Sequence, residues 1–161
     1  MIKVSVVVPV KNDIRIFDLI RALEKQTFKD FEVLIADDSK EKLFNEKTNL
    51  DLKYFHTKSM TIADKFNFLS KRAKANNIAV TESDCIPSEK WLEELVSEYE
   101  NDETIVVGAQ VTSENINYGN LLIPKKAFKI PHDNSMKIAD DTDWFLRLSE
   151  RGFVFKRVYN V

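Results

Sequence analysis

The segment 4–10, VSVVVPV, is an almost uninterrupted run of β-branched apolar residues. Such a run is typical of a strand that is buried on both faces, as in a parallel sheet that helices cover on each side. Residues 31–36 and 78–81 repeat the pattern, and apolar residues at helical spacing precede each of these segments. The alternation predicts an α/β fold with a mostly parallel, partly mixed central sheet flanked by helices.

The remaining elements follow from the same periodicities. We expect helices near residues 16–26, 61–74, 88–99 and 141–151, a weaker helix at 41–49, and strands at 52–55, 104–107, 120–123 and 154–158. Ser88 is the expected N-cap of its helix, and Gly152 is expected to end the last helix. Trp91 and Trp144 fall on apolar helical faces, which favours a place in the core over sugar binding.

The length of 161 residues, with 43% hydrophobic and 31% charged residues, is that of one globular domain. Cys85 is the only cysteine, so the chain can form no internal disulfide and no cysteine-rich zinc site. The formal net charge of -2 lacks the basic field of most nucleic-acid-binding proteins. We therefore expect no nucleic-acid partner.

No apolar run approaches the ~20 residues that cross a bilayer, and the N-terminal residues lack a signal-peptide cleavage site. These features predict a cytoplasmic protein without a transmembrane segment. Low glycine with many Lys, Asn and Ile residues is also compatible with an AT-rich genome, such as that of an archaeon or a virus.

Glycine is scarce, and its positions exclude two common ways of binding a nucleotide. The three glycines, Gly108, Gly119 and Gly152, all lie in the last third of the chain. A dinucleotide-binding fingerprint and a P-loop both need glycines at the first strand-to-helix turn, where the backbone approaches the phosphates. A nucleotide would have to be held in another way, for example through a metal ion on carboxylates.

Polar clusters follow three of the predicted strands. They are Lys11-Asn12-Asp13, Asp37-Asp38-Ser39 and Glu82-Ser83-Asp84. In open α/β sheets, ligands bind beyond the carboxyl ends of the strands, so this edge is the predicted site.

Two of these clusters contain carboxylates with a candidate function. Glu82 and Asp84 offer two carboxylates on the same side of an extended backbone, a pattern suited to Mg2+ or Mn2+ that bridges to a diphosphate. Asp38 is placed to accept a hydrogen bond from a nucleotide base N–H or a ribose hydroxyl. The alternative for each is a solvated loop acid or a group that caps a turn or a helix.

A third acidic group, Asp140-Asp141-Thr142-Asp143, opens the last predicted helix. Carboxylates stabilise the positive end of a helix dipole, and Asp140 with Asp143 resembles a capping box. The like charges also disfavour simultaneous ionisation, so one carboxyl is expected to have a raised pKa suited to a general base.

Other polar residues have simpler interpretations. His132 lies in a polar loop and is expected to be solvated. Lys65 and Asn67 would ordinarily be surface residues of their helix. Cys85 stands beside acidic residues without a base and is expected to be inert.

Four separated segments resemble family 2 glycosyltransferases of the GT-A fold, and together they cover almost the whole chain. They are VSVVVPVKN at 4–12, Ala22-Leu23 with QTFKDFEVLIADDS at 26–39, TESDCIP at 81–87 with Trp91-Leu92, and DDTDWFLRL at 140–148 with Gly152. The second segment is the most specific, and in the first Lys11 stands where an aromatic residue is usual. Glu82-Ser83-Asp84 occupies the metal-binding DxD position with its first Asp replaced.

The resemblance implies one GT-A domain over residues 1–161, with a nucleotide-binding half at 1–100 and an acceptor and catalytic-base half at 101–161. It implies an inverting transfer of a sugar from a UDP- or GDP-sugar to a hydroxyl of a glycan, lipid or protein acceptor. Asp141 takes the position of the general base that removes the proton from that hydroxyl, whose oxygen attacks the anomeric carbon from the face opposite the nucleotide.

The resemblance also implies the ligands of the donor. Asp84 and Glu82 would hold Mn2+ or Mg2+, which stabilises the leaving diphosphate. The implied donor-nucleotide contacts are Pro9, Lys11, Asn12, Asp38, Lys65, Glu82 and Ser83. The segment 125–140 is too short to form much of a lid over the acceptor. Acceptor binding is therefore expected to involve added loops, a second subunit or peripheral contact with a membrane.

Two other enzyme classes are set aside. A sugar-1-phosphate nucleotidyltransferase has a glycine-rich loop after its first strand, and a haloacid-type phosphotransferase has an Asp-x-Asp there, whereas this chain has Lys11-Asn12-Asp13. The alternative from another class is a catalytically silent glycosyltransferase-like module that binds a sugar nucleotide or a protein partner. Glu82 favours that alternative, and Asp141 argues against it because a binding module needs no base.

Overall fold

The computed structural model describes residues 4–44, 47–108, 118–136 and 138–159. Its strands are β1 (Val4–Val10), β2 (Phe31–Asp37), β3 (Leu52–His56), β4 (Asn77–Val80), β5 (Thr104–Gly108), β6 (Leu121–Pro124) and β7 (Val154–Val158). Its helices are α1 (Ile16–Glu24), α2 (Ile62–Arg72), α3 (Trp91–Ser97), the 3-10 helix η1 (Lys125–Lys129) and α4 (Asp140–Glu150). None of the described helices combines the length and the apolarity needed to cross a membrane.

The strands form one seven-stranded sheet in the order β3-β2-β1-β4-β6-β5-β7. Strands β1 to β4 run parallel to one another, and β7 is parallel to β5. Strand β6 is antiparallel to both β4 and β5, so it runs against the other described strands. The mostly parallel, mixed sheet predicted from the sequence is confirmed.

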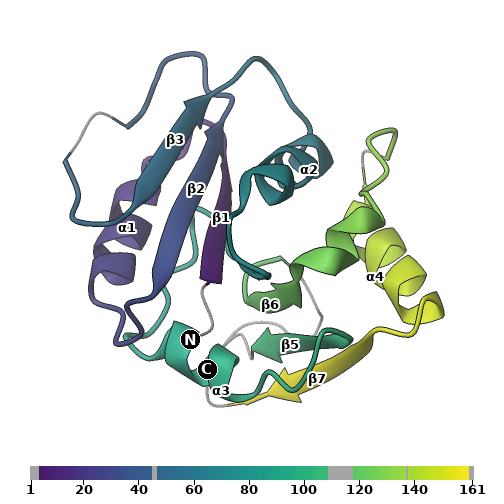
Figure 1. The fold of residues 1–161 in the computed structure, drawn as a ribbon. Coiled ribbons are helices and arrows are strands. Elements are labelled where there is room, and N and C mark those ends of the chain that lie inside the picture. The colour runs from purple at the N-terminus through teal and green to yellow at the C-terminus, as the bar shows by residue number, and fades with distance from the viewer. Residues whose placement is uncertain (1–3, 45–46, 109–117, 137, 160–161) are drawn as a thin grey trace.

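Helices cover both faces of the sheet because side chains alternate along each strand. Val6 and Val8 of β1 belong to the core that faces α1 and α3, whereas Val7 belongs to the core that faces α2 and α4. Figure 1 shows α1 and α2 on opposite sides of the sheet. Trp91 and Trp144 are 2% and 0% exposed, which confirms their predicted place in the core.

Local sequence accounts for two of the helix ends. Helix α2 begins with a capping box, in which the Thr61 side chain accepts from the Asp64 backbone N–H and the Asp64 carboxylate accepts from the Thr61 N–H. Gly152 ends α4 with a φ of 87°, a left-handed conformation that glycine adopts without a steric penalty.

The helix expected at 41–49 is wrong for the described part of that segment. The Leu43 N–H donates to the Tyr54 hydroxyl at 3.1 Å rather than to a helical carbonyl. Phe44 is 7% exposed and packs between Phe17 and Tyr54, with ring centroids 6.2 and 5.8 Å away. Burial of this ring in the α1 core outweighs a weak helical preference.

The expected N-cap at Ser88 is also wrong, because α3 begins three residues later and has no side-chain cap. The buried side chain of Gln26 replaces that cap. Its Oε1 accepts from the Leu92 N–H at 3.0 Å, and its Nε2 donates to the Ser88 carbonyl at 2.6 Å. A residue just after α1 therefore satisfies a backbone N–H in the first turn of α3.

The capping box expected from Asp140 and Asp143 does not form. The N-cap of α4 is Ala139, which has a left-handed backbone (φ 59°, ψ 28°) and makes no side-chain capping bond. Asp143 instead pairs with Arg147 one turn later, at 2.7 Å. The Asp140 side chain turns inward, and its Oδ2 accepts from the Tyr118 hydroxyl at 3.3 Å.

Candidate active site

The three polar clusters predicted to form a site meet at the carboxyl edge of β1, β2 and β4. The Asn12 N–H donates to Ser39 Oγ at 2.6 Å, and the Ser83 hydroxyl donates to Asp13 Oδ2 at 2.6 Å. Asn12 has a φ of 51°, in the left-handed region that asparagine adopts more readily than most residues. This conformation turns the chain from β1 toward the other two clusters.

Asp38 is a buried carboxylate between two lysines. Lys65 Nζ forms an ion pair with its Oδ1, and Lys11 Nζ lies 3.2 Å from its Oδ2. The Met60 N–H donates to the same Oδ2 at 3.2 Å. Burial by itself raises the pKa of Asp38, but the bonds from Lys65 and Met60 lower it by more, so the carboxyl stays ionised at neutral pH.

Lys65 is 5% exposed, so its ordinary interpretation as a surface residue is wrong. The first turn of α2 lies over the ends of β1 and β2, and the Lys65 ammonium also donates to the Val10 carbonyl at 2.8 Å. Pro9, which precedes Val10 in β1, is also buried. Contacts from Pro9, Lys11, Asn12, Asp38 and Lys65 to a donor nucleotide stay predictions.

Asp37 serves the turn after β2. It is fully buried, its Oδ1 accepts from the Ser39 N–H at 2.8 Å, and its Oδ2 accepts from the Tyr54 hydroxyl. Burial, with the bond to Asp37, raises the pKa of Tyr54 to about 12, so that phenol stays protonated. For Asp37 and Ser39 the structure matches the turn-forming alternative.

Glu82 and Asp84 come together through a turn, not along the extended backbone that the sequence suggested. The Cys85 N–H donates to the Glu82 carbonyl at 3.1 Å, which closes the turn. One potential ligand atom from each of Glu82, Asp84 and Cys85 lies within 4.8 Å of the others. Burial raises the pKa of Glu82, and the negative charges of Asp84 and Asp141 add to the effect.

This donor set fits a hard divalent cation. Burial raises the pKa of the Cys85 thiol, which therefore stays protonated and leaves the two carboxylates as the charged ligands. Carboxylate oxygens are the ligands that Mg2+ and Mn2+ prefer, and a cation would relieve the repulsion between Glu82 and Asp84.

Asp141 lies in the first turn of α4, within electrostatic reach of Glu82. Its charge raises the pKa of Glu82, and its Oδ1 accepts from the Thr142 N–H at 2.7 Å. The neighbouring Asp140 is 9% exposed, and its pKa is raised mainly by burial, with the charge of Asp141 adding to the effect. The raised pKa expected in this acidic cluster thus belongs to Asp140.

The sequence did not single out Arg15, which links two of the clusters. Its guanidinium donates to Asp13 at 2.8 and 3.1 Å and lies 3.5 Å from Asp84 Oδ2. The bond from Arg15 lowers the pKa of Asp13 to about 2. The Asp-x-Arg spacing at a strand-to-helix turn was the available signal for the first contact, but nothing local points to Asp84.

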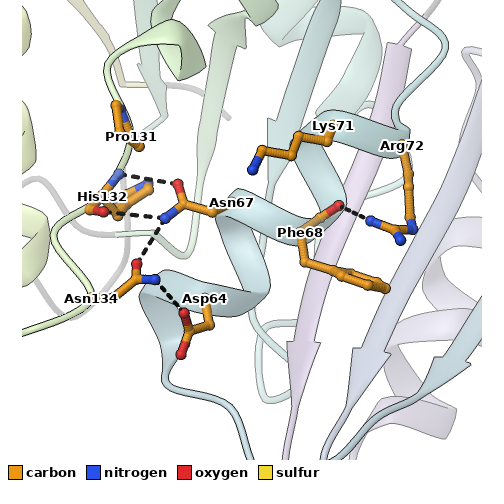
Figure 2. Close-up of a pocket in the computed structure, with 8 residues that line it drawn as sticks. All are labelled: Asp64, Asn67, Phe68, Lys71, Arg72, Pro131, His132 and Asn134. Carbon is orange, nitrogen blue, oxygen red and sulfur yellow. Dashed lines mark hydrogen bonds between the residues drawn. The ribbon is translucent and has the colours of Figure 1, made fainter.

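His132 is buried at 3% exposure, so the expectation of a solvated histidine is wrong. Asn67 joins its loop to α2, as Figure 2 shows: the Asn67 side chain bonds to the backbone N–H and carbonyl of His132 and to Asn134. A pocket of about 420 Å³ lies on this outer side of α2, between Phe68 and Pro131. It lies apart from the clusters at the strand ends.

Comparison with known proteins is consistent with this architecture. A protein-family model described as glycosyl transferase family 2 matches residues 5–156. A search of curated proteins finds no similar sequence.

Several solved structures share the fold. The mannosyltransferase PcManGT from Pyrobaculum calidifontis, in complex with GDP-Man and Mn2+, has a TM-score of 0.81 and 14% identity over 98% of this chain and 55% of its own. TarS 1-349 from S. aureus, in complex with UDP-GlcNAc, has a TM-score of 0.79 and 18% identity over 99% of this chain and 57% of its own. This chain spans little more than half the length of these two proteins.

Proposed function

Because the chain belongs to glycosyl transferase family 2, we propose that it transfers a sugar from a nucleotide-diphosphate sugar to an acceptor hydroxyl group. The GT-A fold expected from the sequence is shown by its similarity to the mannosyltransferase and to TarS. Since those structures hold GDP-Man and UDP-GlcNAc, the proposed donor is a GDP- or UDP-sugar.

One observation carries the proposal: the candidate base lies near enough to a candidate metal ligand for its charge to act on that ligand. Asp141 and Asp84 both act on the pKa of Glu82, although α4 and the Glu82 turn are about 60 residues apart in sequence. A transferase needs a base for the acceptor proton and a charge-neutralising group for the leaving diphosphate at the same place.

In the proposed mechanism, residues 1–100 bind the donor and residues 101–161 supply the acceptor side and the base. Glu82 and Asp84 would hold Mn2+ or Mg2+, which neutralises charge on the diphosphate when bound. Asp141 accepts the proton of the acceptor hydroxyl as its oxygen attacks the anomeric carbon from the face opposite the nucleotide, which inverts that centre. The bond between the anomeric carbon and the diphosphate oxygen breaks in the same step.

The test replaces Asp141 by Asn and follows turnover of UDP-GlcNAc and GDP-mannose with Mn2+. Because a well-placed base contributes about 10² to 10⁴ in rate, we expect Asp141→Asn to lose that factor in kcat while nucleotide affinity, measured by calorimetry, changes little. Asp143→Asn is the matched control, because Asp143 lies in the same turn but pairs with Arg147.

Two results would contradict the proposal. Equal rates for wild type and Asp141→Asn would remove Asp141 from the mechanism. Metal-dependent nucleotide binding without turnover of either donor would favour the silent glycosyltransferase-like module, and the replacement Glu82→Asp would then show whether the altered DxD position is the cause.

A further inference from the structure

Tyr118, His132 and Asp140 form a buried hydrogen-bonded chain behind the first turn of α4. The Tyr118 hydroxyl lies 2.9 Å from His132 Nδ1 and 3.3 Å from Asp140 Oδ2. The three residues are 5%, 3% and 9% exposed, and they come from three separate segments. Asp140 directly precedes Asp141, so this chain ends one residue from the proposed base.

His132 is held from two sides. Its backbone N–H and carbonyl are both bonded to the Asn67 side chain, at 3.1 Å each (Figure 2). Its ring stacks on Trp144 of α4, with centroids 4.0 Å apart and an angle of 29° between the planes. The indole N–H of Trp144 donates to the Ile130 carbonyl at 2.6 Å, which ties the same loop to α4 again.

The pKa values of the three side chains determine which group donates and which accepts each hydrogen bond. Burial lowers the pKa of His132 to about 3, with Arg147 adding to the effect, so the imidazole is neutral at pH 7. Burial and the nearby charges of Asp140 and Asp141 raise the pKa of Tyr118 above its ordinary value. With Asp140 ionised, the Tyr118 hydroxyl donates to Asp140 and accepts from His132 Nδ1–H.

This arrangement leaves one polar atom unsatisfied. His132 Nε2 is buried and has no hydrogen-bond partner among the residues that the structure describes. A buried polar atom without a partner costs about 1–3 kcal/mol, so an apolar residue at this position would be expected to serve stability alone better. The imidazole at this position therefore points to a role for its other nitrogen, Nδ1, which contacts the Tyr118 hydroxyl.

The start of α4 depends on this chain because ordinary capping is missing. Ala139 has a left-handed backbone and provides no side-chain bond to the first turn. The bond from Tyr118 to Asp140 is a side-chain contact that ties this turn to the segment before β6. Consecutive helical residues point about 100° apart, so the rotation that buries Asp140 also sets the direction of Asp141.

We propose that Tyr118 and His132 are positioning residues that hold Asp140 and thereby fix the direction of the Asp141 carboxylate. This inference rests on the proposed function, in which Asp141 is the general base. A displacement of about 1 Å in a reacting group costs up to about 100-fold in rate. Loss of the hydrogen bonds among Tyr118, His132 and Asp140 should therefore lower turnover without weakening the donor site at Glu82 and Asp84.

The first test compares Tyr118→Phe with Tyr99→Phe. Both changes delete a tyrosine hydroxyl that bonds to an aspartate, since Tyr99 donates to Asp102 at 2.6 Å. We expect Tyr118→Phe to lower kcat by about 10- to 100-fold with the Kd for UDP or GDP in Mn2+ within twofold of wild type. Tyr99→Phe should leave both values unchanged.

A second pair of variants separates hydrogen bonding from packing at His132. His132→Phe keeps a ring against Trp144 but removes the bond to Tyr118, and we expect it to match Tyr118→Phe. His132→Asn keeps a polar group at the δ position, and we expect it to recover part of the lost kcat.

The outcomes distinguish this inference from the proposed function. If wild type turns over neither donor, the proposed function fails and the positioning role fails with it. If Asp141→Asn is impaired while Tyr118→Phe keeps full kcat, the positioning role alone is overturned. In a third outcome, kcat and donor affinity both fall only as far as the folded fraction of each variant falls. The Tyr118–His132–Asp140 hydrogen bonds would then serve stability alone, and the positioning role would again be overturned.

Discussion

Replacement of Lys65 by Met tests whether the buried ion pair holds the donor side of the site together. The Lys65 and Asp38 side chains are 6% and 0% exposed. Removing one partner of a buried pair costs about 3–5 kcal/mol. Lys11 and the Met60 N–H still contact Asp38 in the variant, so we take the lower end, about 3 kcal/mol.

The same loss can be expressed as a melting temperature. A chain of 161 residues has an unfolding entropy of about 0.34 kcal/mol/K near 60 °C, so a loss of about 3 kcal/mol lowers Tm by roughly 9 °C. Lys71→Met is the matched control, because Lys71 lies on the same helix, is exposed, and forms no ion pair with the part of the chain that the structure describes. Its free energy of unfolding should change by less than about 0.5 kcal/mol.

The effect of Lys65→Met should depend on pH. In the native protein the pKa of Asp38 is lowered, so Asp38 contributes stability above its unfolded pKa of about 3.9 and loses that contribution as the pH falls through the folded value. In the variant the bond from Lys65 is gone and burial, which raises the pKa, remains. The contacts from Met60 and Lys11 also remain, so ionisation of Asp38 contributes less to stability in the variant than in the native protein.

The two proteins should therefore differ most at pH 7 and less at pH 3.5. Urea unfolding followed by circular dichroism at both pH values measures the difference. A loss below about 1 kcal/mol at pH 7 would refute the desolvation argument. A loss of the same size at both pH values would show that it does not come from the charge on Asp38.

Other changes should have separate effects. Asp84→Ala should abolish Mn2+-dependent binding of UDP or GDP in calorimetry, and an unchanged affinity with and without Mn2+ would place the metal elsewhere. Gly108→Ala would put a methyl group 2.2 Å from Asn120 Nδ2 and displace the amide that accepts from Trp91 Nε1, so we expect a loss of about 1–3 kcal/mol in thermal unfolding. Gln26→Leu should cost about 1–3 kcal/mol, because it leaves the buried Leu92 N–H without its partner while the Ser88 carbonyl still accepts from the Trp91 N–H, and urea unfolding would measure it.

Hydrophobic periodicity was sufficient to predict most of the fold. The strand at 4–10 is buried at every position, and the helix of Ile62–Arg72 is buried along one face. Both patterns can be recognised from neighbouring residues alone. The helix expected at 41–49 had no such regularity. There the burial of Phe44 against Tyr54 decided the conformation.

The candidate site was predicted where chemistry is local and missed where it depends on distant partners. The polar clusters after β1, β2 and β4 could be read from their positions, because parallel strands end at one edge. Lys65 meets Val10 across 55 residues, and Tyr118 meets Asp140 across 22. No single-sequence pattern reports such pairs, so local reasoning predicts a surface lysine and a solvated histidine where the structure has buried ones.

The late position of β6 in the sequence leaves one edge of β4 open while the protein is being synthesised. Strand β4 ends at Val80, but its second neighbour starts at Leu121. At about 5 to 20 residues per second, a ribosome leaves that edge without its partner for roughly 2 to 8 s. An open parallel edge is a template for pairing with other chains, so nascent copies on one polysome should be most prone to aggregate in that interval.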